Sequence, residues 1–363
     1  MLNPLWLAPL VLLLAWGHDD VRTSPVDGLF FALTVPLWFG HRVSSAWLAY
    51  ATPAYRPLLT TQRLRFVVAP LAIAVACFGL LLAPESVLPM PLTERVLCFA
   101  VVDYLLVSHH FAAQHFGLLS LYRARAGRTS DAFARRLDRW FALLIGGGFV
   151  VLAEALAGSI AYQERWIDPL LRAAGGSEAL GRALRHGGIA LVGILTAVLL
   201  VVEMRSQRPS LPRAAYVLGV AAMVLCAFLA RDPFLFIVLW SVQHWSAAMG
   251  LTSLAASGGV QAGTHWQRLL APINQRGWAV LLVLAVLSAL LLPVMEVEAV
   301  TDEYAYADRI FGDAARWLRS SPFVPALLAL GFAAGFIHYL LDRAAFRFSS
   351  PEVRQAARGL LQS

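Results

Sequence analysis

The sequence is short of charge. Charged residues make up 14% of its 363 residues, whereas soluble domains carry about 25%. Hydrophobic residues make up 59%, and the mean hydropathy is +0.66. Apolar runs long enough to cross the ~30 Å hydrocarbon layer of a bilayer recur from one end of the chain to the other. The composition therefore excludes an ordinary soluble fold and predicts a single transmembrane domain, residues 1–363, with no soluble domain attached.

Lysine is absent, and all 29 basic residues are arginine. With its excess of alanine and leucine, the composition is typical of a GC-rich bacterial genome. A net charge of +7 would suggest nucleic-acid binding in a soluble protein. Here, however, the arginines gather in a few short loops, as they do on the cytoplasmic side of membrane proteins. We therefore exclude nucleic acid as a partner and expect the bacterial inner membrane as the location, with the lipid bilayer around the chain.

Cysteine is rare and recognised motifs are missing. Cys77, Cys98 and Cys226 lie in apolar segments without CxxC spacing, which excludes a disulfide framework and a thiolate metal site. The sequence has no P-loop, dinucleotide fingerprint or internal repeat. The apolar run Leu5–Trp16 lacks the basic start and the cleavage site of a signal peptide, so we expect a short first helix there.

The apolar runs predict an all-α, polytopic transmembrane helix bundle of about ten helices. They lie near residues 4–17, 27–51, 65–83, 95–121, 139–162, 187–204, 211–230, 232–256, 276–296 and 322–346. Basic loops alternate with acidic or mixed ones, which places both termini in the cytoplasm. Thr301–Ser320 and Trp166–His186 are connecting segments that fit either interfacial amphipathic helices or solvated loops.

Costly polar residues concentrate in four of these helices. An ionisable side chain within the bilayer costs several kcal/mol unless it is satisfied, so each one requires an explanation. The residues are His41 in the second helix, Asp103, His109, His110, Gln114 and His115 in the fourth, Gln243 and His244 in the eighth, and His338 and Asp342 in the tenth. All four helices run from outside to inside in the predicted topology, because all are even-numbered.

Four of the histidines lie at one depth. At 1.5 Å per residue, the imidazoles of the four helices fall roughly 18 to 24 Å below the outer boundary. This coincidence predicts a metal centre, whereas a single intramembrane histidine would more often be a packing residue. The predicted ligands are His41, His110, His244 and His338. Gln114, Asp342 and Asp103 are predicted further ligands or partners of the ligands.

The spacing on the fourth helix separates its histidines. Asp103, His110 and Gln114 share one stripe, because they lie seven and four residues apart. His109 and His115 point away from His110, so a second metal, or packing, must account for these two candidate ligands. On the tenth helix, Asp342 shares a face with His338 and either orients its imidazole or pairs with a nearby arginine.

Imidazole and carboxylate ligands suit a transition metal, with iron or copper expected before zinc. The aromatic surroundings favour oxidation of a lipophilic substrate or electron transfer with a quinone. Haem bound by two histidines is an alternative cofactor. A proton- or ion-coupled transporter is an alternative function, because buried histidines and carboxylates also relay protons.

The segment SHHFAAQHFG, from Ser108 to Gly117, resembles the histidine boxes of membrane fatty-acid desaturases and hydroxylases. That resemblance implies a di-iron site that uses oxygen. The chain departs from the family because the usual HxxxH and HxxHH boxes are absent. The fragments HFAAQHFG, SVQHW and IHYLLDRAAFRF also resemble uncharacterised bacterial inner-membrane proteins that are rich in histidine.

The charge pattern makes a prediction about topology. The segment Arg123–Arg139 should be cytoplasmic and Thr301–Ser320 external, because short basic loops stay inside. Single cysteines introduced into the two segments should react with an impermeant reagent from opposite sides of the membrane. Equal reactivity from one side would remove the shared helix direction on which the depth argument rests.

Overall fold

The computed structural model describes residues 6–18, 21–127, 132–148, 177–230, 233–258, 264–296, 306–358 and 360. These residues contain helices and no strand, which confirms the all-α class. Five helical stretches among them are long and apolar enough to cross a membrane. They are Leu64–Leu82, Leu92–Arg125, His186–Met204, Gly277–Met295 and Val324–Ala345.

Fifteen α-helices lie in the described residues, so the ten-helix count is not confirmed. They are α1 (Leu7–Ala15), α2 (Pro25–Ala46), α3 (Arg56–Thr61), α4 (Ala69–Leu82), α5 (Leu92–Arg125), α6 (Ala132–Phe141), α9 (Ser177–Met204), α10 (Leu211–Ala230), α11 (Pro233–Ser257), α12 (His265–Gln275), α13 (Gly277–Met295), α14 (Tyr306–Phe311), α15 (Asp313–Ser320), α16 (Val324–Ala345) and α17 (Pro351–Ala356). Several of the additional helices are short and lie in segments that hydropathy assigns to loops.

Some helices continue with a different pitch. The π-helices η3 (Trp47–Ala51) and η6 (Ala142–Gly148) extend α2 and α6, η5 (Leu64–Val68) leads into α4, and the 3₁₀ turns η2 (Val21–Thr23) and η4 (Pro53–Tyr55) precede α2 and α3. Residues 149–162 of the helix expected at 139–162, and residues 166–176 of the second connecting segment, lie outside the described residues. So do residues 301–305, and the rest of that segment forms α14 and α15, which are separated at Gly312 by a positive φ of 53°.

The chain divides into two compact units. Unit 1 contains residues 31–106 and 245–363, and unit 2 contains residues 2–30 and 107–244. The division falls within α2, α5 and α11, so each of these helices contributes residues to both units.

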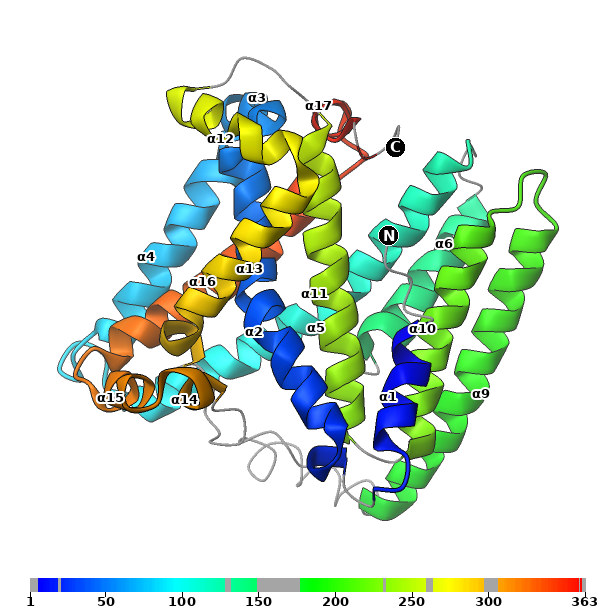
Figure 1. The fold of residues 1–363 in the computed structure, drawn as a ribbon, viewed down its shortest axis with the longest axis horizontal. Coiled ribbons are helices and arrows are strands. Elements are labelled where there is room, and N and C mark those ends of the chain that lie inside the picture. Colours follow the sequence, from blue (N-terminus) through cyan, green and yellow to red (C-terminus); the bar gives the residue numbers. More distant parts are fainter. Residues whose placement is uncertain are drawn as a thin grey trace. The chain divides into compact units, whose positions relative to one another are not determined.

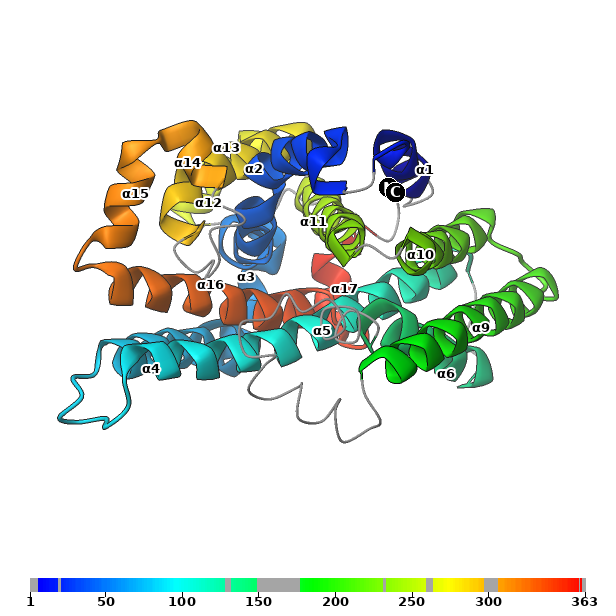
Figure 2. The same cartoon turned by 90° about the horizontal axis from the view of Figure 1, so that it is seen from below.

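Unit 1 is built on the packing of α16 against α4, which run side by side (Figures 1 and 2). Cys77 and Leu81 of α4 form a buried cluster with Leu328, Ala329, Phe332 and Ala333 of α16. The first part of α5 completes the cluster, because the ring of Phe99 lies 5.2 Å from that of Phe332. Small residues on α16 let the two helices approach closely.

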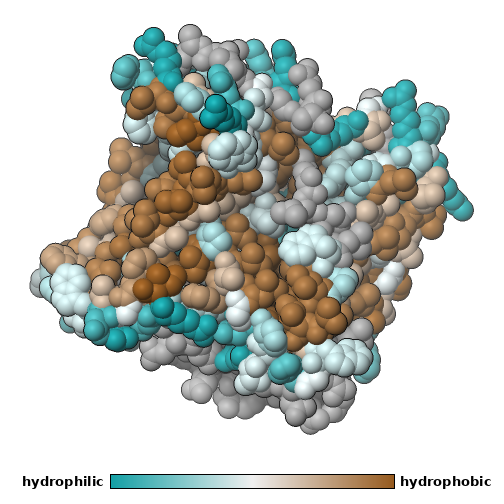
Figure 3. All heavy atoms as spheres, in the orientation of Figure 1, coloured by the Kyte–Doolittle hydropathy of each residue, from teal (hydrophilic) through white to brown (hydrophobic). Residues whose placement is uncertain are grey.

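The helix α13 shows how unit 1 meets its surroundings. The exposed large side chains are Trp278, Leu282, Val286 and Leu290. The buried ones are Val280, Leu284, Ser288 and Leu292. Each set repeats every four residues, so α13 has one face toward the protein and one outward apolar face. Figure 3 shows hydrophobic side chains over α13, with hydrophilic ones gathered at α12 and at α14 and α15. An apolar surface between polar ends suits a bilayer.

Unit 2 is held by a buried ion-pair network across four helices. Asp138 on α6 pairs with Arg123 of α5, and its Oδ1 lies 2.5 Å from Nη2 of Arg213 on α10. Arg213 also pairs with Glu203 of α9, and all four side chains are buried. Burial raises the pKa of the Asp138 carboxyl, although the two arginines oppose that shift. The network therefore fixes the adjoining ends of these helices through paired charges.

Replacing one partner should test this network. Asp138→Asn should destabilise the fold by about 3 to 5 kcal/mol, because it leaves buried arginine charge without its partner. Thermal unfolding of the purified protein in detergent measures the change. The control is Asp313→Asn, which removes an exposed ion pair with Arg316 and should leave the midpoint almost unchanged. Equal midpoints for the two variants would show that the buried network contributes little.

Candidate metal centre

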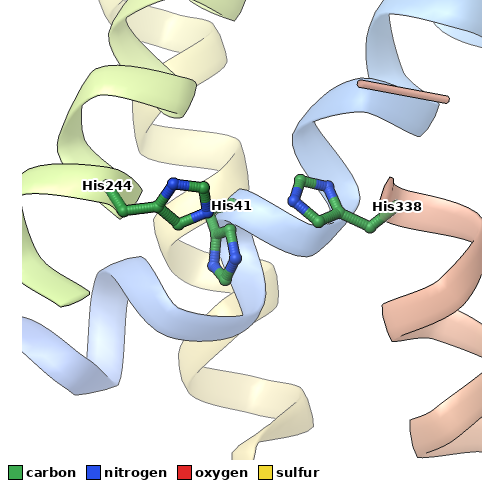
Figure 4. Close-up of side chains that lie close together, drawn as sticks. All are labelled: His41, His244 and His338. Carbon is green, nitrogen blue, oxygen red and sulfur yellow. The ribbon is translucent and has the colours of Figure 1, made fainter. Parts of the chain in front are cut away.

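Two of the predicted ligands meet within unit 1. The rings of His41 on α2 and His338 on α16 make an edge-to-face contact, with centroids 4.9 Å apart. A ring nitrogen of each lies within 4.8 Å of one on the other, and both side chains are buried. Figure 4 shows the two rings on different helices, with the side chain of His338 extending toward His41, and it also labels His244 of α11. Ring nitrogens this close together could hold one metal ion.

Glycine brings α2 close to its neighbour immediately before His41. A Cβ added to Gly40 would lie 2.8 Å from the carbonyl oxygen of Leu284 on α13, so only glycine fits without a shift. The backbone N–H of Phe39 also donates to Oγ of Ser288, at 3.1 Å. These two contacts fix the position of α2 where it carries the first imidazole.

The ring of each histidine in this pair is oriented by an oxygen atom. Nδ1 of His41 donates a hydrogen bond to the carbonyl oxygen of Trp38, one turn earlier in α2. Nδ1 of His338 lies 3.0 Å from Oγ of Ser45. Ser45 lies one turn after His41 on α2, but its hydroxyl hydrogen-bonds the histidine of α16. Trp245 stacks on His41, with ring centroids 5.8 Å apart.

Unit 2 contains a second pair of the predicted ligands. The ring of His110 on α5 lies edge-to-face with that of His244 on α11, at 4.8 Å. Gln114 lies one turn after His110, and its Oε1 is 2.6 Å from Nδ1 of His244. Its Nε2 donates to the carbonyl oxygen of His244, at 3.3 Å. Both functional atoms of Gln114 are therefore engaged by His244, which gives Gln114 an orienting role.

These partners determine which nitrogen of the imidazole can ligate. A carbonyl or amide oxygen only accepts hydrogen bonds, so Nδ1 carries the proton in His41 and in His244. Nε2 then carries the lone pair in both rings. Metal-bound histidines in proteins commonly have this arrangement, with one nitrogen on the metal and the other held by an oxygen. Ser45 can donate or accept, so it permits the same tautomer in His338.

The other histidines of α5 have different surroundings. Nδ1 of His115 lies 2.6 Å from the hydroxyl of Tyr216, and its ring fills the space beside Gly146, where a Cβ would collide with it. His115 is therefore hydrogen-bonded and closely packed within unit 2. His109 is exposed, so its side chain points away from the buried imidazoles.

The two carboxylates predicted near the ligands both lie in unit 1. Oδ1 of Asp103 accepts a 3.0 Å hydrogen bond from Tyr339, and Asp103 and Arg42 both lie beside Gly335. The predicted stripe on α5 is thus shared between units, since His110 belongs to unit 2.

Asp342 is buried one turn after His338. Its carboxylate interacts electrostatically with Tyr55. Burial, and then Asp342, raises the pKa of Tyr55, whose hydroxyl donates to the carbonyl of Ala345 at 3.1 Å. The sequence gives no signal for Tyr55, because it follows α2 in a short turn without a motif.

Gln114 provides a test of the orienting contact. Gln114→Ala removes the acceptor of a buried imidazole N–H and should destabilise the protein by ~1 to 3 kcal/mol. The midpoint of thermal unfolding measures this loss. Gln275→Ala on α12 is the matched control, because that side chain is exposed and its removal should have little effect. A midpoint for Gln114→Ala equal to that of the control would contradict the assigned contact.

No family model, curated protein or solved structure matches the chain. The function is therefore inferred from the buried imidazoles and the residues that orient them.

Proposed function

We propose that the chain is an integral membrane metalloenzyme, an iron- or copper-dependent oxygenase or oxidase acting on a lipophilic substrate. The observation that carries the proposal is the buried contact of His41 with His338, from two helices, with an oxygen at Nδ1 of each ring. Two buried imidazoles from different helices, with ring nitrogens within 4.8 Å of one another, could hold a metal ion between them. Iron and copper are suited to imidazole ligands.

His244 is the proposed third ligand. The sequence predicts this histidine at the same depth as His41 and His338. His110 contacts the ring of His244 and is the proposed fourth ligand. Gln114 orients His244, and Asp342 is a proposed further ligand or partner of His338.

The contact geometry favours a single ion over haem. A haem with two histidine ligands separates their rings by the thickness of the macrocycle. His41 and His338 instead touch edge to face at 4.9 Å. When bound, an iron or copper ion would supply oxygen activation. The protein would hold the ring tautomers, and its apolar walls would exclude water, which strengthens electrostatic interactions and limits side reactions.

The membrane setting has its own support. Five described helical stretches have the length and hydropathy of membrane spans, and α13 has an outward apolar face. We place the chain in the bacterial inner membrane with both termini cytoplasmic, from the distribution of arginine. A bundle of about ten transmembrane helices remains the proposed architecture.

Metal analysis tests the proposal directly. Protein expressed in metal-replete medium should contain about one equivalent of iron or copper. His41→Ala and His338→Ala should each lose most of it, because each removes a ligand. Asp342→Asn should weaken metal affinity by about 10 to 100-fold if it acts through His338. Elemental analysis and absorption spectra give the readout.

The comparison must be made at equal yield of folded protein. His109→Ala is the control, because its side chain is exposed and its loss should leave the metal content unchanged. Full metal content in His41→Ala and His338→Ala would make these histidines structural and end the enzyme proposal. A Soret band would identify the cofactor as haem. Proton transport across vesicle membranes by metal-free protein would identify the function as transport.

A further inference from the structure

The helix α12 has three distinct faces. Gln267, Leu270 and Asn274 are buried. Trp266 and Leu269 are 58% and 62% exposed, and at helical spacing they lie within about 60° of one another. The remaining face carries His265, Arg268, Gln275 and the C-cap Arg276, all of which are exposed. One face thus meets protein, a second is apolar and outward, and a third is polar.

Buried amides fix the rotation of α12. Asn274 donates to the carbonyl of Ala51, at 2.9 Å, and accepts from the indole N–H of Trp47, at 2.8 Å. Gln267 donates to the carbonyls of Tyr50 and Thr52, each at 3.4 Å. These groups belong to η3 and the residue after it. Because the bonds are directional, α12 cannot turn its Trp266 and Leu269 stripe inward without breaking them.

The apolar stripe lies at a basic end of unit 1. The helix α12 contacts η3 and η4, and η4 contacts α3 and α17. Exposed arginines of this end are Arg56, Arg63, Arg65, Arg268, Arg276 and Arg354. In the helices α3, α12 and α17, the one acidic residue is Glu352. In contrast, α14 and α15 combine their arginines with Asp308 and Asp313.

We infer that this end of unit 1 binds anionic phospholipid headgroups, with α12 lying in the membrane interface. Trp266 and Leu269 would enter the boundary of the acyl chains, as on other interfacial amphipathic helices. Arg268 and Arg276 would meet headgroup phosphates, since basic residues beside a membrane attract anionic lipid. The inference depends on membrane embedding but not on the metal centre. The hydrogen bonds of Gln267 and Asn274 also join α12 to η3, which directly follows α2.

Binding of short-chain phosphatidylglycerol to the purified full chain in non-ionic detergent tests the inference. The intact protein should bind it more tightly than phosphatidylcholine of the same chain length. Arg268→Gln and Arg276→Gln should each weaken binding by about fivefold, and together by about 25-fold. Native mass spectrometry can count the bound lipids.

The matched control is Arg316→Gln on α15, an exposed arginine paired with Asp313, which should bind phosphatidylglycerol as the intact protein does. The midpoint of thermal unfolding verifies that each variant is folded. If Arg268→Gln does not fold, Arg276→Gln gives an independent test. Equal binding of both lipids, or equal effects of Arg268→Gln and Arg316→Gln, overturns the inference. Displacement of the lipid by an equal concentration of inorganic phosphate also overturns it, since the ligand would then be the free ion.

Discussion

The structure depends on the satisfaction of polar groups inside apolar helices. An imidazole or carboxylate in an apolar region is costly unless a partner meets it. His41 bonds a carbonyl of its own helix, His338 bonds a serine of another helix, and His244 bonds the amide of Gln114. Each of these bonds also fixes a ring orientation. The same requirement that keeps the helices stable therefore also determines how these imidazoles are turned.

Close backbone approach accompanies these contacts. Gly40 lies against the carbonyl of Leu284, and Gly147 lies against that of Ser108. Helices pack this closely where a side chain is missing. The π-helices η3 and η6 lie in the same regions, one following the helix of His41 and the other containing Gly146 and Gly147. Such departures from α-helical pitch are frequent at functional sites, and here η3 also exposes the carbonyls that hold α12.

The two units obtain their stability in different ways. Unit 1 has a hydrophobic cluster between α4 and α16. Unit 2 contains a buried network in which two arginines pair with two carboxylates. Paired buried charges contribute little net stability compared with apolar packing, but losing one partner is expensive. The network of unit 2 is therefore best understood as a constraint on the arrangement of α5, α6, α9 and α10.

The sequence by itself determined the helical class and pointed to five apolar helical stretches that the structure also contains. Hydropathy and helical periodicity are properties of consecutive residues, so they can be read without a fold. Hydropathy did not reveal short helices such as α12, because their apolar stripes are too narrow to raise the local average.

Tertiary structure alone decided which side chains meet. Ser45 serves His338 rather than His41, Gln114 is engaged by His244, and His115 bonds Tyr216. Spacing along one helix gives the direction of a side chain, but not the neighbour that it faces. That neighbour is set by the packing of helices far apart in the sequence, through contacts such as that of Gly40 with Leu284.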